Sequence, residues 1–355
     1  MLIYWFLLLF PFLMIITDHN KIYTFGKFNI FTSSNFAWVS FFFILVITIG
    51  LRHQIGPDWY NYENMLGVAR EGNFIKSIKF SDPGYMLLNI IGAKWGGLYL
   101  VNTFAALIFS YGLIRFCNRQ LNPWLAILVA VPYLVNVVAM SYTRQSASIG
   151  FIFLGLIALA DKKYFKFILL ILLASSFHKS AIILLPLVIV SETLNGSIFK
   201  TFIIFLFVIF IYIIQGEYFI NTIKFYSEQN LNSIGDIVRL SMTLIPSIIF
   251  IIFFKNFNLD SYQGKLWMLY SLSGFGLVLL LIFSSASAWV DRLGLFWIPL
   301  QIFILSRLPN IFKPGVSKFI ITIIIISSYL AVAFVWLFYG QNTKHFLPYK
   351  SLLLT

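Results

Sequence analysis

Five short stretches of a largely apolar chain bring charged and polar side chains close together in sequence. These are "RHQIGPDWYNYE" from Arg52, "SDPGY" from Ser81, "SYTRQS" from Ser141, "FHKS" from Phe177 and "WVDRLG" from Trp289. Together they hold three arginines, two histidines, a lysine and four carboxylates. Guanidinium groups bind phosphate oxygens through paired hydrogen bonds, and a carboxylate or imidazole can accept a proton. The combination indicates chemistry on an anionic, phosphate-bearing ligand.

The elements that must position these side chains are membrane helices. The 355 residues are 60% hydrophobic, 19% aromatic and only 10% charged, and the mean hydropathy is +0.90. A soluble protein of this length could not bury so much apolar surface. No stretch alternates with period two as a transmembrane barrel requires. We therefore predict an all-α, polytopic transmembrane bundle. Its net charge of +13 indicates basic cytoplasmic loops rather than nucleic-acid binding.

Apolar runs divide the chain into span-sized segments within a single transmembrane domain, residues 1–355. We expect about 10 to 12 spans, some short or broken. The runs lie at residues 1–16, 36–51, 86–114, 122–139, 146–160, 166–177, 180–191, 198–214, 237–254, 266–285, 290–305 and 318–339. Runs 166–177 and 180–191 are each too short to cross about 30 Å of hydrocarbon, so we expect two half-spans meeting at "FHKS". The longest segments outside the membrane, about 52–85 and 215–236, are expected to be periplasmic, with a small helical part.

Basic residues set the orientation of this bundle. With two half-spans and an outward N-terminus, the inner loops carry 13 Lys and Arg against four acids, and the outer segments 11 against eight. Cytoplasmic loops usually have such a basic excess. This orientation puts all five polar stretches on the outer side, at or just inside span ends. Ionisable groups there face a bundle interior or a wet cavity. Arg144, with no acid nearby in sequence, needs a distant carboxylate or an anionic ligand.

Each of these residues also has a structural interpretation. Asp58 follows Pro57 and could cap a short helix, and Arg52 could extend from its span end to the interface. Asp291 could pair with another helix, and His178 could satisfy backbone groups freed at a helix break. Three arginines, a histidine and a lysine on one face are harder to explain together in this way. They suit a lipid-linked diphosphate sugar at the outer interface.

At these residues the sequence resembles the EpsG-like branch of the Wzy polysaccharide polymerases of bacterial inner membranes. The resemblance covers about residue 45 to the end of the chain. The residues that carry it are Arg52, Gly56, Asp58 and Tyr62; Pro83, Gly84 and Tyr85; Arg144 and Gln145; "ASSFHKSA" with His178 and Lys179; Arg292; and "LPYKS" with Pro348, Tyr349 and Lys350. It implies a multi-pass glycosyltransferase of the inner (cytoplasmic) membrane. Such an enzyme polymerises undecaprenyl-diphosphate-linked repeat units of O-antigen (lipopolysaccharide), capsule or exopolysaccharide at the periplasmic face.

The resemblance also implies roles for individual residues. The candidates for binding the diphosphate, whose charge develops as it leaves, are basic: Arg52, Arg144, Lys179 and Arg292. Arg144 is therefore a catalytic candidate as well. Asp58 is the first choice for the general base and His178 the second. The candidates for contacting sugar follow Asp58 directly: Trp59, Tyr60, Tyr62 and Glu63.

No cofactor and no metal are expected. The resemblance implies that cleavage of the glycosyl–diphosphate bond supplies the energy. The chain has neither a DxD motif nor a phosphate-binding glycine loop. The single cysteine, Cys117, excludes a Cys-rich metal site. Expected partners are the lipid-linked glycan, membrane lipids and a chain-length regulator protein.

Other functions remain open at this point. An O-antigen ligase would use the same donor, although ligases usually have one large outer loop. A lipid-linked oligosaccharide flippase would line a path through the bilayer with charges instead of gathering them on one side. A purely structural assembly partner would give no reason for several arginines near span ends.

Overall fold

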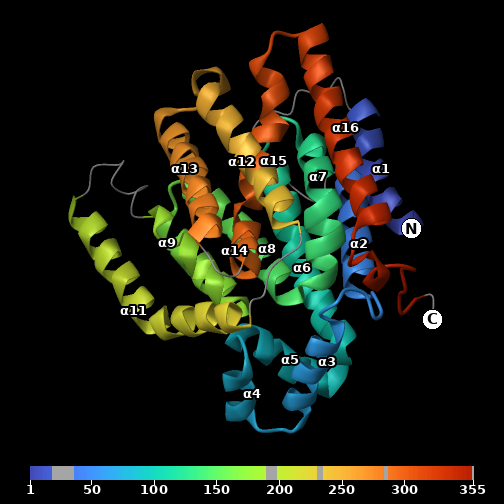
Figure 1. Cartoon of the computed structure of the whole chain (residues 1–355), viewed down its shortest axis with the longest axis vertical. Helices are drawn as coiled ribbons and strands as arrows, with labels where there is room; N and C mark the ends of the chain where they lie inside the picture. The colour runs from blue at the N-terminus through green and yellow to red at the C-terminus, as the bar shows by residue number, and fades with distance from the viewer. Residues whose placement is uncertain (18–35, 189–197, 230–234, 284–286, 354–355) are drawn as a thin grey trace.

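The computed structural model describes residues 1–17, 36–188, 198–229, 235–283 and 287–353. Within these ranges the chain is helical, and the β-pairing described there is an isolated bridge between Arg52 and Ser351. Figure 1 shows most helices side by side in one bundle, with a smaller helical lobe at one end. The all-α bundle predicted from composition is confirmed.

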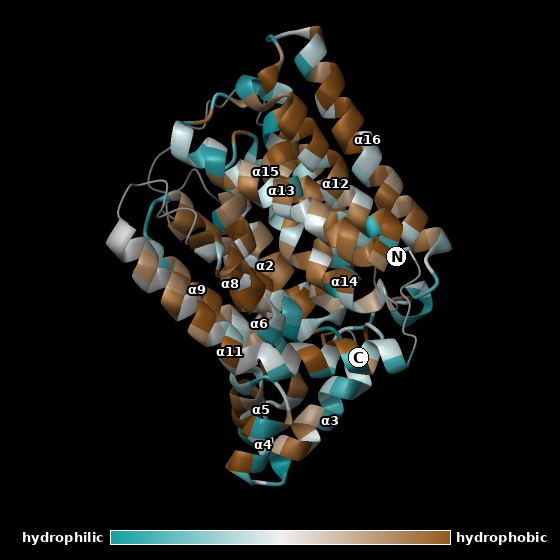
Figure 2. Ribbon diagram, turned by 60° about the vertical axis from the view of Figure 1, so that its left-hand side comes forward, coloured by the Kyte–Doolittle hydropathy of each residue, from teal (hydrophilic) through white to brown (hydrophobic). Residues whose placement is uncertain are grey.

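Several helices of the described ranges are long and apolar enough to cross a membrane. Five segments reach that length: Gly97–Cys117 (α6), Thr143–Ala160 (α8), Ser261–Phe283 (α13), Ser287–Ile311 and Val316–Tyr339 (α16). Segment Ser287–Ile311 contains α14 (Ser287–Gly294) and α15 (Ile298–Arg307). Shorter apolar helices are Leu2–Thr17 (α1), Phe36–Gly50 (α2), Pro123–Ala139, which begins with α7 (Pro123–Ala130), and Tyr164–Phe177 (α9). Hydrophobic residues run along these helices in Figure 2. The chain is thus a multi-pass membrane protein.

The lobe consists of α3 (Trp59–Arg70), α4 (Phe74–Phe80) and α5 (Pro83–Trp95). The apolar run 86–114 was expected to be continuous, and this expectation is wrong. The chain breaks at Gly96, and Gly97 has a left-handed backbone with φ +61°, a conformation that glycine adopts without steric cost. The break separates α5 from α6, so that α5 packs with α3 and α4.

The break expected at "FHKS" is confirmed. Helix α9 ends at Phe177, His178 is extended, and a short 3₁₀ helix (η3) follows over Lys179–Leu184. The end of the second half-span lies outside the described residues. Beyond it, α11 (Ile198–Glu228) is one 31-residue helix that joins run 198–214 to the first part of segment 215–236. Its C-terminal part lies beside α14 (Figure 1).

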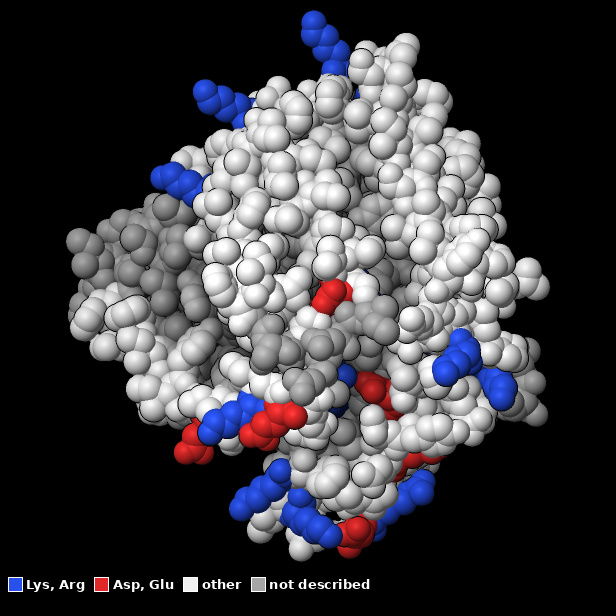
Figure 3. All heavy atoms as spheres, viewed as in Figure 1, with Lys and Arg blue, Asp and Glu red and all other residues white. Residues whose placement is uncertain are grey.

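Charge is distributed unevenly over the molecule. On the face shown in Figure 3, acidic and basic side chains gather around the lobe and the adjoining end of the bundle. The opposite end bears Lys and Arg without acids on that face. Loops at that other end, after α6 and α8, are joined by an ion pair between Arg119 and Asp161. On the face shown in Figure 3, the exposed acidic side chains are therefore concentrated toward the lobe end.

Two glycines bring α6 and α8 into backbone contact. A Cβ added at Gly112 would lie 2.1 Å from the Gly150 carbonyl oxygen, and one added at Gly150 would lie 2.6 Å from the Ile108 oxygen. Small residues permit this close approach of membrane helices. The contact fixes α8, whose first turn carries Arg144.

Gly150→Ala should therefore destabilise the bundle. The added methyl group overpacks the α6–α8 contact, at a cost of about 1–3 kcal/mol. Gly276→Ala in α13 is the matched control, since no atom lies within 4 Å of its Cβ position. We expect the melting temperature in detergent, measured by fluorescence-detected size exclusion, to fall only for Gly150→Ala. Equal melting temperatures would contradict the close contact.

Candidate functional site

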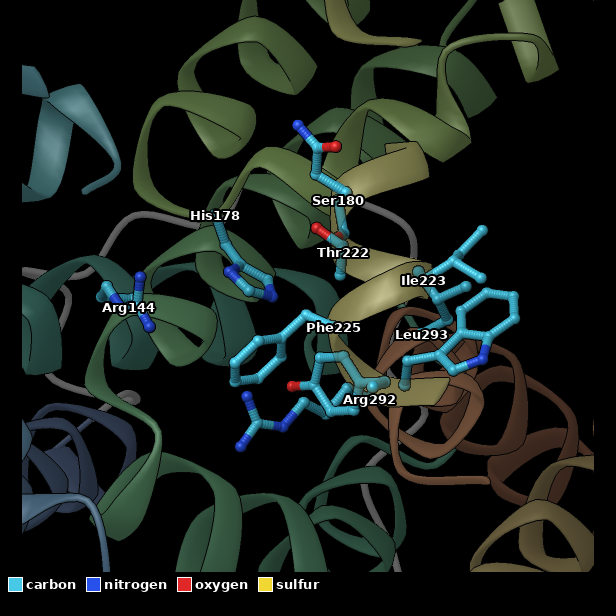
Figure 4. A pocket seen from close by; sticks show the side chains of 11 residues that line it. Arg144, His178, Ser180, Thr222, Ile223, Phe225, Arg292 and Leu293 are labelled. Carbon is cyan, nitrogen blue, oxygen red and sulfur yellow. The ribbon is translucent and has the colours of Figure 1, made fainter. Parts of the chain in front are cut away.

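A cavity of about 410 Å³ lies between α8, α11, α14 and the break after α9. Its volume is in the range of small-molecule sites. Three of the residues predicted from sequence line it: Arg144 from α8, His178 from the break and Arg292 from α14 (Figure 4). Segments far apart in the chain thus bring two cations and an imidazole to one space.

Arg144 finds the distant carboxylate that its position required. Its Nη1 donates to Asp82 Oδ2 at 2.7 Å and to Ser81 Oγ at 2.8 Å. Asp82 stands just before Pro83, the first residue of α5, and only 3% of it is exposed. Its second oxygen accepts the Lys179 backbone amide at 3.2 Å. One carboxylate therefore joins the lobe, α8 and the break after α9.

His178 lies next to the same carboxylate. Its Nδ1 is 3.9 Å from Asp82 Oδ2, which is too long for a hydrogen bond. Burial lowers the pKa of His178, Asp82 raises it, Arg144 and Arg292 lower it again, and the net pKa is below the ordinary 6.5. Burial would raise the pKa of Asp82, but His178, Arg144 and the Lys179 amide outweigh burial and hold it below 3.8. At neutral pH, Asp82 is charged and His178 is neutral and able to accept a proton.

Arg292 is held by its backbone while its side chain stays available. Its carbonyl oxygen accepts a hydrogen bond from Gln145 Nε2 at 2.7 Å. Its guanidinium carbon lies 5.8 Å from the ring centres of Tyr142 and Tyr226, a cation–π arrangement. In the described part of the chain, this guanidinium makes no ion pair. Arg292 thus presents positive charge to the cavity.

The neighbouring Asp291 has a structural role. It pairs with Arg239 of α12 (Asp236–Ile252) through two hydrogen bonds, Nε to Oδ1 at 2.7 Å and Nη2 to Oδ2 at 2.9 Å. Pairing with another helix was the structural interpretation of Asp291, and it is confirmed. The pair fixes α14 against α12, which keeps Arg292 in place.

Arg52 does not line the cavity. It is 1% exposed, so the structural interpretation in which it extends to the interface is wrong, and its predicted diphosphate-binding role stays a prediction. Its guanidinium donates to the Ile49 carbonyl, to Thr143 Oγ1 at 2.6 Å and to Asn102 Oδ1 at 3.4 Å. Arg52 therefore links α2 and α6 to the residue that precedes Arg144.

The C-terminal stretch "LPYKS" packs against the chain around Arg52. The Lys350 carbonyl accepts the His53 amide at 3.0 Å, and Arg52 bridges to Ser351. Tyr349 donates from its hydroxyl to the Thr48 carbonyl at 2.8 Å. "LPYKS" and "LRHQIGP", far apart in sequence, are therefore neighbours in the fold.

Asp58 occupies the N-cap position of α3 without capping it through its side chain. Its Oδ1 accepts a hydrogen bond from the Asn61 side-chain amide at 3.4 Å. Its charge is close enough to act on Arg292, but Asp58 does not line the cavity. The side-chain cap that the sequence suggested is thus not made, and Asp58 lies beside the site rather than in it.

The other predicted site residues also lie outside the cavity lining. Trp59 is buried and donates from Nε1 to Glu63 Oε1 at 2.9 Å. Tyr62 is buried edge-on against Tyr85. Tyr60 is 67% exposed. Lys179 contributes its backbone amide to Asp82. The sugar-binding and diphosphate-binding roles given to these residues stay predictions without a place in the cavity.

One whole wall of the cavity was not predicted from the sequence. Asp82 had been recognised as polar but was given no role. The lining residues to which no role was assigned from the sequence are Ser180, Asn221, Thr222, Ile223, Phe225, Tyr226, Trp289 and Leu293. Residues 221–226 carry no motif and could be found only once α11 was known to continue past residue 214. Among the described residues, no group of three or more His, Cys, Asp and Glu could hold a metal ion.

Comparison with known proteins identifies a family. The model of the EpsG family matches residues 35–351. This range contains every residue that lines the cavity, together with Asp82 and Arg52. No curated protein and no solved structure matches the chain.

Asp82→Asn should destabilise the protein far more than Asp58→Asn. Removing the Asp82 charge leaves Arg144 without its buried partner, which costs about 3 kcal/mol or more. Asp58 loses only one long hydrogen bond to an exposed amide. Melting temperatures of the two variants in the same detergent check this. Equal values would show that Asp82 does not hold the site together.

Proposed function

The chain belongs to the EpsG family, and from that premise we propose that it polymerises glycan repeat units carried on undecaprenyl diphosphate. At the coarser level, it is a membrane protein of polysaccharide biosynthesis with glycosyltransferase-like polymerase activity. The finer proposal places the reaction at the periplasmic face of the bacterial inner membrane, without metal or cofactor. The observation that carries it is the convergence of Arg144, His178 and Arg292 on one cavity.

The two arginines suit a diphosphate leaving group. Asp82 compensates Arg144 and fixes its orientation. Arg292 adds a charge that no ion pair in the described part of the chain neutralises, so the cavity keeps a net positive charge. Cations that are already in position stabilise the charge that develops on the leaving group without reorganisation. Planar guanidinium groups can each bind two phosphate oxygens.

His178 suits the transfer of the proton. A hydroxyl oxygen of the incoming unit attacks C1 of the donor sugar, and the C1–oxygen bond to the diphosphate breaks. The diphosphate leaves with the bonding electron pair, and the hydroxyl proton passes to the neutral imidazole. Asp58 is the alternative acceptor. The cavity favours His178, which lines it, over Asp58, which does not.

The other functions fit the geometry less well. A flippase needs charges along a path through the bilayer. Here the cavity lies at one end of the bundle, and the Arg119–Asp161 ion pair links two loops at the opposite end. A ligase would share the donor and the arginines, and the family favours the polymerase over it.

Arg292→Gln should abolish long polymer while leaving the amount of protein in the membrane unchanged. The substitution breaks no ion pair of the described residues, and losing one preorganised cation lowers the rate by about 10²–10³-fold. Lys76→Gln is the control, because Lys76 pairs with Glu71 on the exposed lobe surface. Chain length in a complemented deletion strain, analysed by gel electrophoresis, is the measurement. Wild-type polymer from Arg292→Gln would refute the assignment.

The rate of polymerisation should fall on acidification. Because the pKa of His178 is below 6.5, the imidazole is neutral at pH 7–8 and becomes protonated, and inactive as a base, only below that range. His178→Gln should lower the rate by about 10²–10⁴-fold and remove this acid limb. Rates of the purified protein in nanodiscs across pH 5–8.5 test this. An acid limb that persists in His178→Gln would assign it to another group.

A further inference from the structure

The cavity has two chemically different walls. Arg144, His178 and Arg292 make the basic wall. The other wall belongs largely to the C-terminal part of α11, where Asn221 and Thr222 supply neutral polar groups. Figure 4 shows Thr222 on α11, across the space from Arg144. A bound diphosphate would need only the basic wall, so the α11 wall must serve another part of a ligand.

Neutral amide and hydroxyl groups match sugar hydroxyls. Asn221 is exposed, and the structure gives its side chain no hydrogen bond to the described residues. An amide offers two donors and an acceptor, and a hydroxyl both donates and accepts. Sugar hydroxyls have the same dual character, whereas a phosphate only accepts and a hydrocarbon tail does neither. Ser180 and Tyr226 add two further hydroxyl groups to the lining, and the lining side chains Ile223, Phe225 and Leu293 are apolar.

Trp289 adds an aromatic surface beside the basic wall. It lies on α14 three residues before Arg292, and side chains at this spacing are neighbours about 5–6 Å apart on one helix face. A half-buried indole provides a flat apolar surface with one polar edge, which can cover the apolar face of a sugar ring. A diphosphate held by Arg292 would therefore bring its attached sugar to Trp289.

We infer that Asn221, Thr222 and Trp289 form a glycan subsite that contacts the sugar bonded to the diphosphate. This inference rests on the proposed function and names the part of the substrate that this side of the cavity recognises. It assigns sugar contact to α11 and α14 instead of to the residues that follow Asp58. Specificity for the first sugar then depends on a wall separate from the one that binds the diphosphate.

Binding of two lipids to the full-length protein in nanodiscs tests the subsite. One is the lipid-linked repeat unit isolated from a strain that lacks this protein, and the other is undecaprenyl diphosphate without sugar. Asn221→Ala and Trp289→Ala should each weaken binding of the repeat unit about tenfold, the loss expected for one polar or aromatic contact. Binding of the sugar-free lipid should stay within twofold. Lys224→Gln, on the same helix but outside the lining, should change neither.

Thr222→Val, which keeps the side-chain shape, replaces any variant whose melting temperature shows that it does not fold. Equal losses for both lipids, or no loss for either, would overturn the subsite. The proposed function has a separate readout in the same nanodiscs, the formation of polymer from repeat units by the wild-type protein. Selective loss of sugar binding without any polymer would support the subsite and refute the polymerase assignment.

Discussion

The site depends on the interactions of the Asp82 carboxylate with Arg144 and with the Lys179 backbone amide. This carboxylate is almost fully buried, and a buried charge is costly unless it is paired and hydrogen-bonded. Arg144 and the Lys179 amide supply that compensation, and His178 lies beside it. Because Asp82 directly precedes α5, this one group couples the lobe to the bundle. Displacement of the lobe would therefore move both Arg144 and the break that carries His178.

The first residues of α8 connect Asp82 to the other parts of the site. Three consecutive residues each contact a different element: Thr143 accepts from Arg52, Arg144 donates to Asp82, and Gln145 donates to the Arg292 carbonyl. The α6–α8 glycine contact fixes the helix behind them. The two cavity arginines therefore have distinct roles. Arg144 is held by a buried anion, whereas Arg292 is held by its backbone and leaves its charge for a ligand.

Much of this could be predicted from sequence because its causes are local or compositional. Apolar composition determines a membrane bundle, and the short runs on either side of His178 require a break. The predicted topology put Arg144, His178 and Arg292 on the same side of the membrane, and the three line one cavity. The pairing of Asp82 with Arg144 and the burial of Arg52 depend on tertiary contacts that sequence spacing does not encode. Which side of α11 faces the cavity depends on tertiary contacts in the same way. The break in run 86–114, by contrast, has a local cause in the adjacent glycines Gly96 and Gly97.

We propose that Arg144 and Arg292, which line the same cavity, hold one diphosphate between them. A cryo-electron microscopy map of the full-length protein in nanodiscs with undecaprenyl diphosphate would test it most directly. We expect density for both phosphates inside the cavity, within hydrogen-bonding distance of both guanidinium groups. Density for the head group at another site, such as Lys179 or the exposed lobe surface, with no diphosphate between the two arginines, would contradict it.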